Sequence, residues 1–141
     1  MEQIIKEKIS ADHLLYVSLK YTKTCDVIIN LLLRWRTMID LGMEHLITRA
    51  KKKKKWKAVP DAPRAKLVQL KQVYSDDPLI SETLRLYELF RDIETLPKVR
   101  ENEFRKGVNL KVTYHGEIIN INLDKLKEYS SLLERFISSL K

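Results

Sequence analysis

An apolar stripe at helical spacing runs from Leu14 to Leu46 and constrains the fold more than any other feature. Between Ser10 and Ala50 the chain has no proline and one glycine, and successive members of the stripe lie three or four positions apart. This spacing is typical of one helix face, sustained for about nine turns. It predicts one long N-terminal helix, or two in tandem joined near Thr22–Thr24, with Ser10 as the N-cap. The members are Leu14, Val17, Tyr21, Cys25, Ile28, Leu32, Trp35, Ile39, Gly42 and Leu46.

Proline and aspartate divide the rest of the chain into shorter helices. Two prolines between residues 60 and 63 predict a loop over 58–62 and a second helix that begins near Pro63. Asp77 and Pro78 predict the N-terminus of a third helix, which Pro97 ends or kinks. We expect residues 98–105 to continue as a helical turn or two, and residues 2–8 to be able to form a short extra helix.

The segment 108–123 alternates apolar and polar residues with a period of two, which predicts a β-hairpin. A two-residue turn at His115-Gly116 pairs Tyr114 with Glu117 and brings three apolar pairs onto one face. A shift of one residue would destroy this agreement. The pairs are Val112–Ile119, Leu110–Ile121 and Val108–Leu123. A final helix capped by Asp124 follows.

Together these elements predict a mainly α protein, an up-and-down helical bundle with a single β-hairpin before the C-terminal helix. Its 141 residues fit a single domain, 1–141, with the basic run and the loop 58–62 inside it. One cysteine excludes a disulfide scaffold, and no apolar stretch is long enough to span a membrane. We expect a cytoplasmic protein without a cofactor. Scarce glutamine and abundant lysine are typical of heat-adapted proteins.

Positive charge is concentrated in one segment, residues 49–57. The net charge of the chain is +8, but outside this window 20 basic and 19 acidic residues leave a net charge of +1. Nucleic-acid binding is the leading function for such a run, with lysines on phosphates and a tryptophan that stacks on a base. An anionic lipid surface, or a solvated loop with the tryptophan anchored in the core, are the alternatives. The candidate residues are Arg49, Lys51, Lys52, Lys53, Lys54, Lys55, Trp56 and Lys57.

A second polar patch lies in the segment 100–106. Arg100 and Arg105 could hold a phosphate, with Glu103 between them. Surface ion pairs within the segment are the simpler interpretation. If the chain were a nuclease, Arg100, Glu101, Glu103 and Arg105 would be the residues most suited to the chemistry.

No other residues form a recognisable catalytic or metal-binding motif. His13, His45 and His115 belong to different predicted elements and have no cysteine or carboxylate at ligand spacing. Cys25 lies within the apolar stripe, where a buried and unreactive thiol is expected. The sequence therefore favours a protein that is not an enzyme and gives no catalytic residue and no metal ligand.

Four segments together resemble small archaeal helical-bundle proteins related to the HEPN superfamily. They are Ala11–Thr22, Pro60–Pro63, Leu86–Arg91 and Glu103–Arg105, so the resemblance spans roughly residues 11–106. It implies a bundle that dimerises through its long helices, and many HEPN members are ribonucleases or partners of small nucleotidyltransferases in toxin–antitoxin pairs. The ribonuclease members carry an arginine followed by four to six residues and then a histidine. In this sequence nine residues separate Arg105 from His115 and eight separate Arg36 from His45, so the motif is not found.

The central part of the long predicted helix, Val27–Leu33, is apolar on more than one face, which is typical of a helix packed on two sides. We therefore expect a homodimer through this helix. The favoured function is a non-catalytic HEPN-like dimer that binds a nucleic-acid or protein partner. The alternatives are a ribonuclease or toxin–antitoxin component with a non-standard active site, and a structural subunit with no role in nucleic-acid binding.

Overall fold

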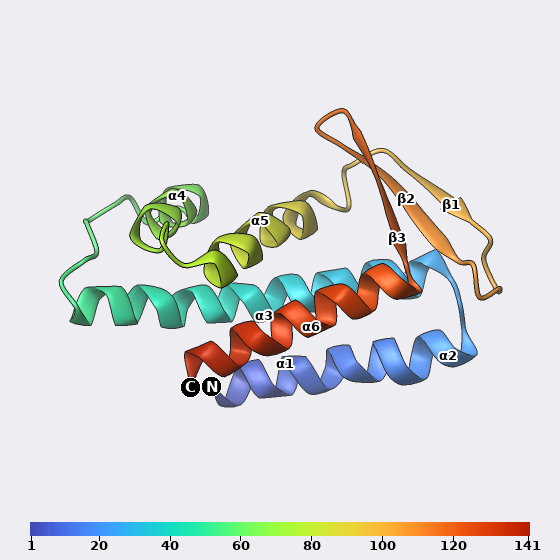
Figure 1. The fold of residues 1–141 in the computed structure, drawn as a ribbon, viewed down its shortest axis with the longest axis horizontal. Coiled ribbons are helices and arrows are strands. Elements are labelled where there is room, and N and C mark those ends of the chain that lie inside the picture. The colour runs from blue at the N-terminus through green and yellow to red at the C-terminus, as the bar shows by residue number, and fades with distance from the viewer.

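The computed structural model describes residues 1–141 as an elongated, mainly helical molecule with a small sheet near one end (Figure 1). The central helix is α3 (Cys25–Lys52). On one side it contacts α1 (Glu2–His13), which continues through the π-helical stretch η1 (Leu14–Ser18) into α2 (Leu19–Tyr21). It also contacts α4 (Pro63–Val73), α5 (Pro78–Asp92) and α6 (Leu123–Leu140). The predicted fold class, mainly α with strands before the last helix, is confirmed.

The helix α3 forms where the stripe predicts it and buries the predicted face. Thr24 caps it, since its hydroxyl accepts a hydrogen bond from the Val27 N–H at 3.4 Å, and Asp26 lies in the first turn. The stripe residues of α3 are all buried: Cys25, Ile28, Leu32, Trp35, Ile39, Gly42 and Leu46.

The first part of the stripe is phased differently from the prediction. The tandem alternative is right, because the helix stops at Tyr21 and Thr22 leaves the helical conformation. The first helix begins at Glu2, so Ser10 lies inside it and is no N-cap. The wider turns of η1 rotate the side chains that follow, and Tyr21 points to solvent with 78% of its surface exposed. The residues of this segment that are buried in the core are Ile4, Ala11, Leu15 and Leu19.

The second and third helices begin as predicted. Pro63 starts α4, and Asp77 caps α5 by accepting a hydrogen bond from the Ile80 N–H at 3.1 Å. Pro78 occupies the first position of α5, where a missing N–H costs nothing.

The hairpin has the predicted register, and a third strand joins it. The antiparallel sheet has the order β1 (Lys98–Glu101), β2 (Asn109–Tyr114) and β3 (Glu117–Asn122). His115 and Gly116 form the turn, both with positive φ, of 50° and 78°, as a type I′ turn requires. The residue pairs between β2 and β3 include Tyr114–Glu117, Val112–Ile119 and Leu110–Ile121.

Three details of this region correct the sequence-based expectation. Residues 98–101 form the edge strand β1, although we expected helical turns over 98–105. The predicted Val108–Leu123 pair does not form, because Leu123 already begins α6. Asn122, and not Asp124, caps α6 by accepting a hydrogen bond from the Lys125 N–H at 2.9 Å.

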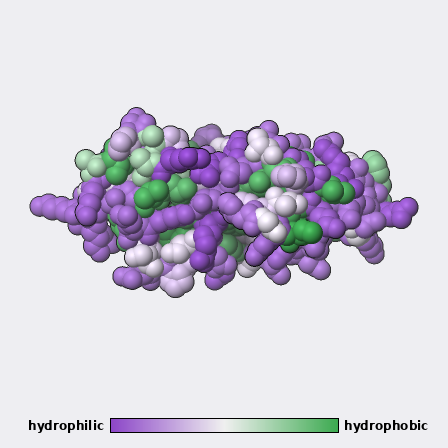
Figure 2. Space-filling view, turned by 90° about the horizontal axis from the view of Figure 1, so that it is seen from above, coloured by the Kyte–Doolittle hydropathy of each residue, from purple (hydrophilic) through white to green (hydrophobic).

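The apolar faces of α3 are covered within the chain itself. Ile28, Leu31 and Leu32 are buried, and Val27, Ile29 and Leu33 pack against the same core. Packing within one chain therefore explains why Val27–Leu33 is apolar on more than one face. The homodimer stays a prediction, and this pattern no longer supports it. None of the helices combines the length and the apolar character needed to cross a bilayer. The face in Figure 2 is mostly hydrophilic, with separate apolar patches.

Candidate nucleic-acid interface

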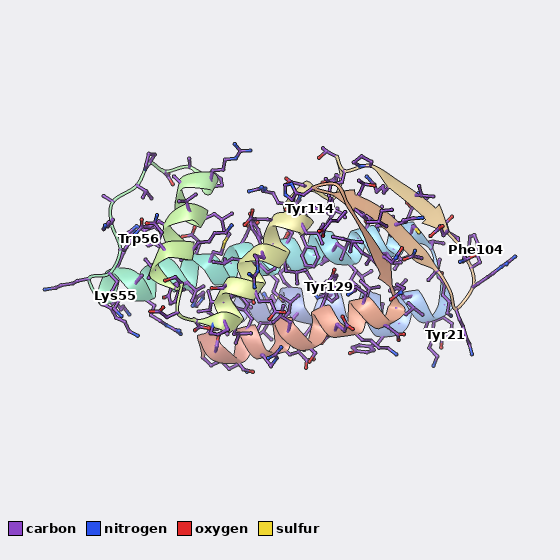
Figure 3. All side chains as sticks on the ribbon, turned by 45° about the horizontal axis from the view of Figure 1, so that its top comes forward. Tyr21, Lys55, Trp56, Phe104, Tyr114 and Tyr129 are labelled. Carbon is purple, nitrogen blue, oxygen red and sulfur yellow. The ribbon has the colours of Figure 1, made fainter.

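The lysine run, defined as Lys51–Lys55 and Lys57, lies at the C-terminal end of α3, at one end of the molecule (Figure 3). Lys51 and Lys52 belong to the last turn of α3, and Lys53–Lys55 and Lys57 lie beyond the helix. All six side chains are exposed, and none of them forms an ion pair. The structure therefore gathers a strong unpaired positive charge in a short segment.

Trp56 fixes the loop that carries these lysines. Its side chain is half-buried and packs against the hydrophobic core. Lys54 has a positive φ of 56°, and the Lys55 N–H returns to the Ala50 carbonyl oxygen at 2.9 Å, which closes the end of the helix. The tryptophan thus anchors the loop, which is the alternative role considered for it, and the lysines project from that anchor.

Arg49 differs from the other basic residues of the run. Its guanidinium donates hydrogen bonds to the carbonyl oxygens of Ser139 and Leu140 at 3.1–3.3 Å, at the C-terminal end of α6. Arginine in this position satisfies carbonyl groups that have no partner within their own helix. Arg49 therefore joins the ends of α3 and α6.

A polar hollow of about 550 Å³ borders the lysine run on α3. Its lining contains no apolar side chain and consists of Glu44, His45, Thr48, Arg49 and Lys52. Two of the predicted residues, Arg49 and Lys52, contribute to it. The hollow extends the polar surface of the run along one face of the helix.

The second predicted patch holds the start of α3 in place. Arg100 Nη1 lies 2.8 Å from Asp26 Oδ1 and 3.6 Å from Glu103 Oε1. Glu103 Oε1 also accepts a hydrogen bond from the Cys25 N–H at 2.9 Å. The hydrogen bond and charge of Asp26 raise the pKa of Arg100 above its ordinary value. Arg100, in β1, and Glu103, in the loop that follows, thus contact the N-terminus of α3, whereas Arg105 is exposed and makes no ion pair.

Cys25 and His45 lie beside the two patches: His45 lines the hollow with Arg49 and Lys52, and Cys25 begins α3 next to Glu103. The Cys25 thiol is buried and donates to the Asn109 carbonyl oxygen at 3.4 Å, and burial raises its pKa. No group of three or more histidine, cysteine, aspartate or glutamate side chains is arranged to hold a metal ion.

One groove was not predicted from the sequence. It has a volume of about 640 Å³ and lies between α5, α6 and the hairpin, with Tyr114 and Tyr129 among apolar and charged side chains. Burial, and next the charge of Glu128, raise the pKa of Tyr129 to about 12. Because the lining comes from separate segments of the chain, no local sequence pattern could have revealed the groove.

Comparisons of the chain with protein-family models, with curated proteins and with solved structures give no match. The resemblance to the HEPN superfamily therefore stays a prediction.

Proposed function

We propose that this protein binds nucleic acid through Lys51–Lys55 and Lys57 and has no catalytic role. One observation carries the proposal: six exposed lysines without ion pairs lie within seven residues, while the chain outside residues 49–57 has a net charge of only +1. Lysines that neutralise phosphates release counterions, and this release supplies most of the affinity for a nucleic-acid backbone. Outside residues 49–57, no segment of seven residues in the chain holds as many basic residues.

The position of the lysines supports this function over a purely structural one. Positive charge in the last turn of a helix interacts favourably with the helix dipole, which accounts for Lys51 and Lys52. That interaction falls off beyond the last turn, so it does not account for Lys53–Lys55 and Lys57. These four lysines project from a loop that Trp56 anchors to the core. Anchoring reduces the conformational entropy that the loop loses when it binds a ligand.

The second polar patch supports a binding role without catalysis. Glu103 accepts the Cys25 N–H, and Arg100 is paired with Asp26, so both side chains have structural partners. In the ribonuclease alternative these groups would have to face a substrate. Because Arg100 and Glu103 instead contact residues of α3, binding without catalysis is favoured over ribonuclease activity.

The experiment compares two variants with equal loss of charge. In the first, Lys53, Lys54, Lys55 and Lys57 are replaced by serine; these positions lie outside α3, so its stability is preserved. The control replaces Lys6, Arg85, Lys111 and Arg135 by serine; these residues are spread over other elements and form no ion pairs. Fluorescence anisotropy with labelled single-stranded RNA and duplex DNA measures the affinity of each.

We expect the lysine-run variant to lose roughly tenfold or more in affinity for both ligands, and the control to lose much less. Equal losses in the two variants would show that only the net charge matters and would contradict a defined interface. Absence of binding by the unchanged protein would reject the proposal altogether.

A further inference from the structure

The end of the molecule opposite the lysine run carries two exposed aromatic side chains (Figure 3). Tyr21 at the end of α2 is 78% exposed, and Phe104 in the loop between β1 and β2 is 76% exposed. We call this end the aromatic tip and define it as residues 20–23 and 102–107. Both rings face solvent, so neither contributes much to the core.

The backbone presents Phe104 in an unfavourable conformation. Its φ is 66°, in the left-handed region that is unfavourable for a residue with a bulky side chain; Asn102, with a φ of 52°, is of a type that adopts this region more readily. The Phe104 N–H donates to the Lys23 carbonyl oxygen at 2.6 Å, and the neighbouring Glu103 accepts the Cys25 N–H. The loop is therefore held rigidly against the start of α3. Stability alone would favour glycine or asparagine at position 104, and strain of this kind is often found at functional sites.

Positive charge surrounds the two rings. Lys20, Lys23, Arg105 and Lys106 form no ion pair. The Lys20 ammonium lies 5.9 Å from the centre of the Tyr21 ring, within the range of a cation–π interaction. Exposed aromatic rings among unpaired cations have the composition of surfaces that bind unpaired nucleotides.

A polar hollow of about 670 Å³ lies next to the tip and is lined by side-chain amides. The Asn109 side-chain nitrogen donates to Glu101 Oε1 and to the side-chain Oδ1 of Asn120, while the buried Asn109 Oδ1 has no partner. Amide groups carry both donors and acceptors and can pair with the edges of bases. The other polar lining residues are Asn102, Asn122, Lys23, Lys106, Lys127 and one carboxylate, Asp124.

We propose that the aromatic tip is a second binding site, specific for single-stranded nucleic acid. Bases stack on Phe104 and Tyr21, phosphates contact the surrounding cations, and the amide-lined hollow receives a base edge. A duplex keeps its bases stacked and paired, so it cannot use these rings. This site lies at the opposite end of α3 from the lysine run, and a 28-residue helix is about 42 Å long. It is therefore independent of the lysine run.

The test is made in the background of the four-lysine serine variant, which keeps only Lys51 and Lys52 of the lysine run, so that a loss caused by changes at the tip is easier to measure. The test variant combines Phe104→Ala with Tyr21→Ala and so removes both rings. Alanine, like phenylalanine, has a Cβ atom, so the positive φ at position 104 stays unfavourable and glycine-like flexibility is not introduced. The matched control is Val68→Ala with Ile9→Ala, two exposed apolar residues away from the tip. The ligands are a labelled ten-nucleotide uridine strand and a ten-base-pair RNA duplex.

We expect removal of the rings to weaken single-strand binding about 5- to 100-fold, with the salt dependence unchanged and duplex binding unaffected. Phe104→Trp should retain single-strand binding. Lys23→Ser with Lys106→Ser should instead reduce the slope of log K against log salt by about 0.7 for each phosphate that these lysines neutralise.

Single-strand binding equal to that of the Val68 and Ile9 control would overturn the proposal, as would an equal loss for the duplex. Neither outcome concerns the lysine run, whose own variant is compared in the unmodified background. The two proposals can therefore fail separately.

Discussion

At the scale of single residues, Gly42 is a position where α3 and α6 approach each other closely. A Cβ atom at this position would lie 2.6 Å from Phe136 Cε2 and 2.8 Å from Phe136 Cζ. Phe136 is fully buried and has little freedom to move. The absence of a side chain at residue 42 is therefore a packing requirement, which the sequence showed only as one small member of an apolar stripe.

Gly42→Ala should lower the free energy of unfolding by about 1–3 kcal/mol, because the added methyl group overpacks the contact with Phe136. Urea unfolding followed by circular dichroism measures the change. The matched control is Gly107→Ala, where the nearest atom to an added Cβ is 3.8 Å away. A loss no larger at residue 42 than at residue 107 would show that the two helices can separate at little cost.

The raised pKa of Tyr129 predicts how the free energy of unfolding changes at alkaline pH. Its ring packs edge-on against Phe90, with the ring centres 5.6 Å apart, and its pKa is raised from 10.0 to about 12. Between these values the folded chain keeps a proton that the unfolded chain loses. The contribution of Tyr129 to the free energy of unfolding is therefore complete below pH 10 and is lost as the pH rises to about 12.

Tyr129→Phe keeps the ring and removes the titration, so its free energy of unfolding should fall less steeply than that of the unchanged protein over this pH interval. Urea unfolding at a series of pH values measures both slopes. Other groups that titrate in this range are the same in both proteins and cancel in the difference. Parallel curves would contradict the assignment of a raised pKa to Tyr129.

At the scale of elements, the sequence predicts those whose signals are local. The hairpin register could be found because Leu110 and Val112 alternate with polar residues. The two strands are also consecutive in the chain and are joined by a short His-Gly turn. The helix α5 could be found from Asp77 and Pro78. The strand β1 could not, because it is an edge strand whose middle residues are exposed, so it shows no apolar alternation. The phase of η1 could not be found either, since a π-helical turn departs from the 3.6-residue period on which the prediction depends.

The contact between the β1–β2 loop and α3 gives a prediction at this scale. Glu103→Ala removes the acceptor for the Cys25 N–H at the first turn of α3 and one of the two carboxylates around Arg100. We expect the free energy of unfolding to fall by about 0.5–2 kcal/mol, as for other helix caps. Thermal or urea unfolding measures it, with Glu117→Ala, at an exposed position that begins β3, as control. If both variants were equally stable, Glu103 would be free for another role and the structural account of the patch would be wrong.

At the scale of the whole molecule, the two candidate sites lie at the two ends of α3 (Figure 3). The lysine run could be predicted because its residues are nearly consecutive in the sequence. Anchoring of Trp56 in the core was one of the two roles that the sequence suggested for it. The aromatic tip could not, because Tyr21 and Phe104 are more than eighty positions apart and come to the same end of the molecule only once the β1–β2 loop is bound to the segment before α3. Phe104 also lies within the segment 98–105, for which we expected helical turns.

The salt dependence of duplex DNA binding tests the central claim most directly. Log K is measured against log salt for the unchanged protein and for the variant with serine at positions 53, 54, 55 and 57. Each neutralised phosphate contributes about −0.9 to the slope for duplex DNA, so the variant should have a slope less negative by about two to four units. Identical slopes in the two proteins would mean that these lysines do not contact phosphates, and would contradict the account of the lysine run as a nucleic-acid interface.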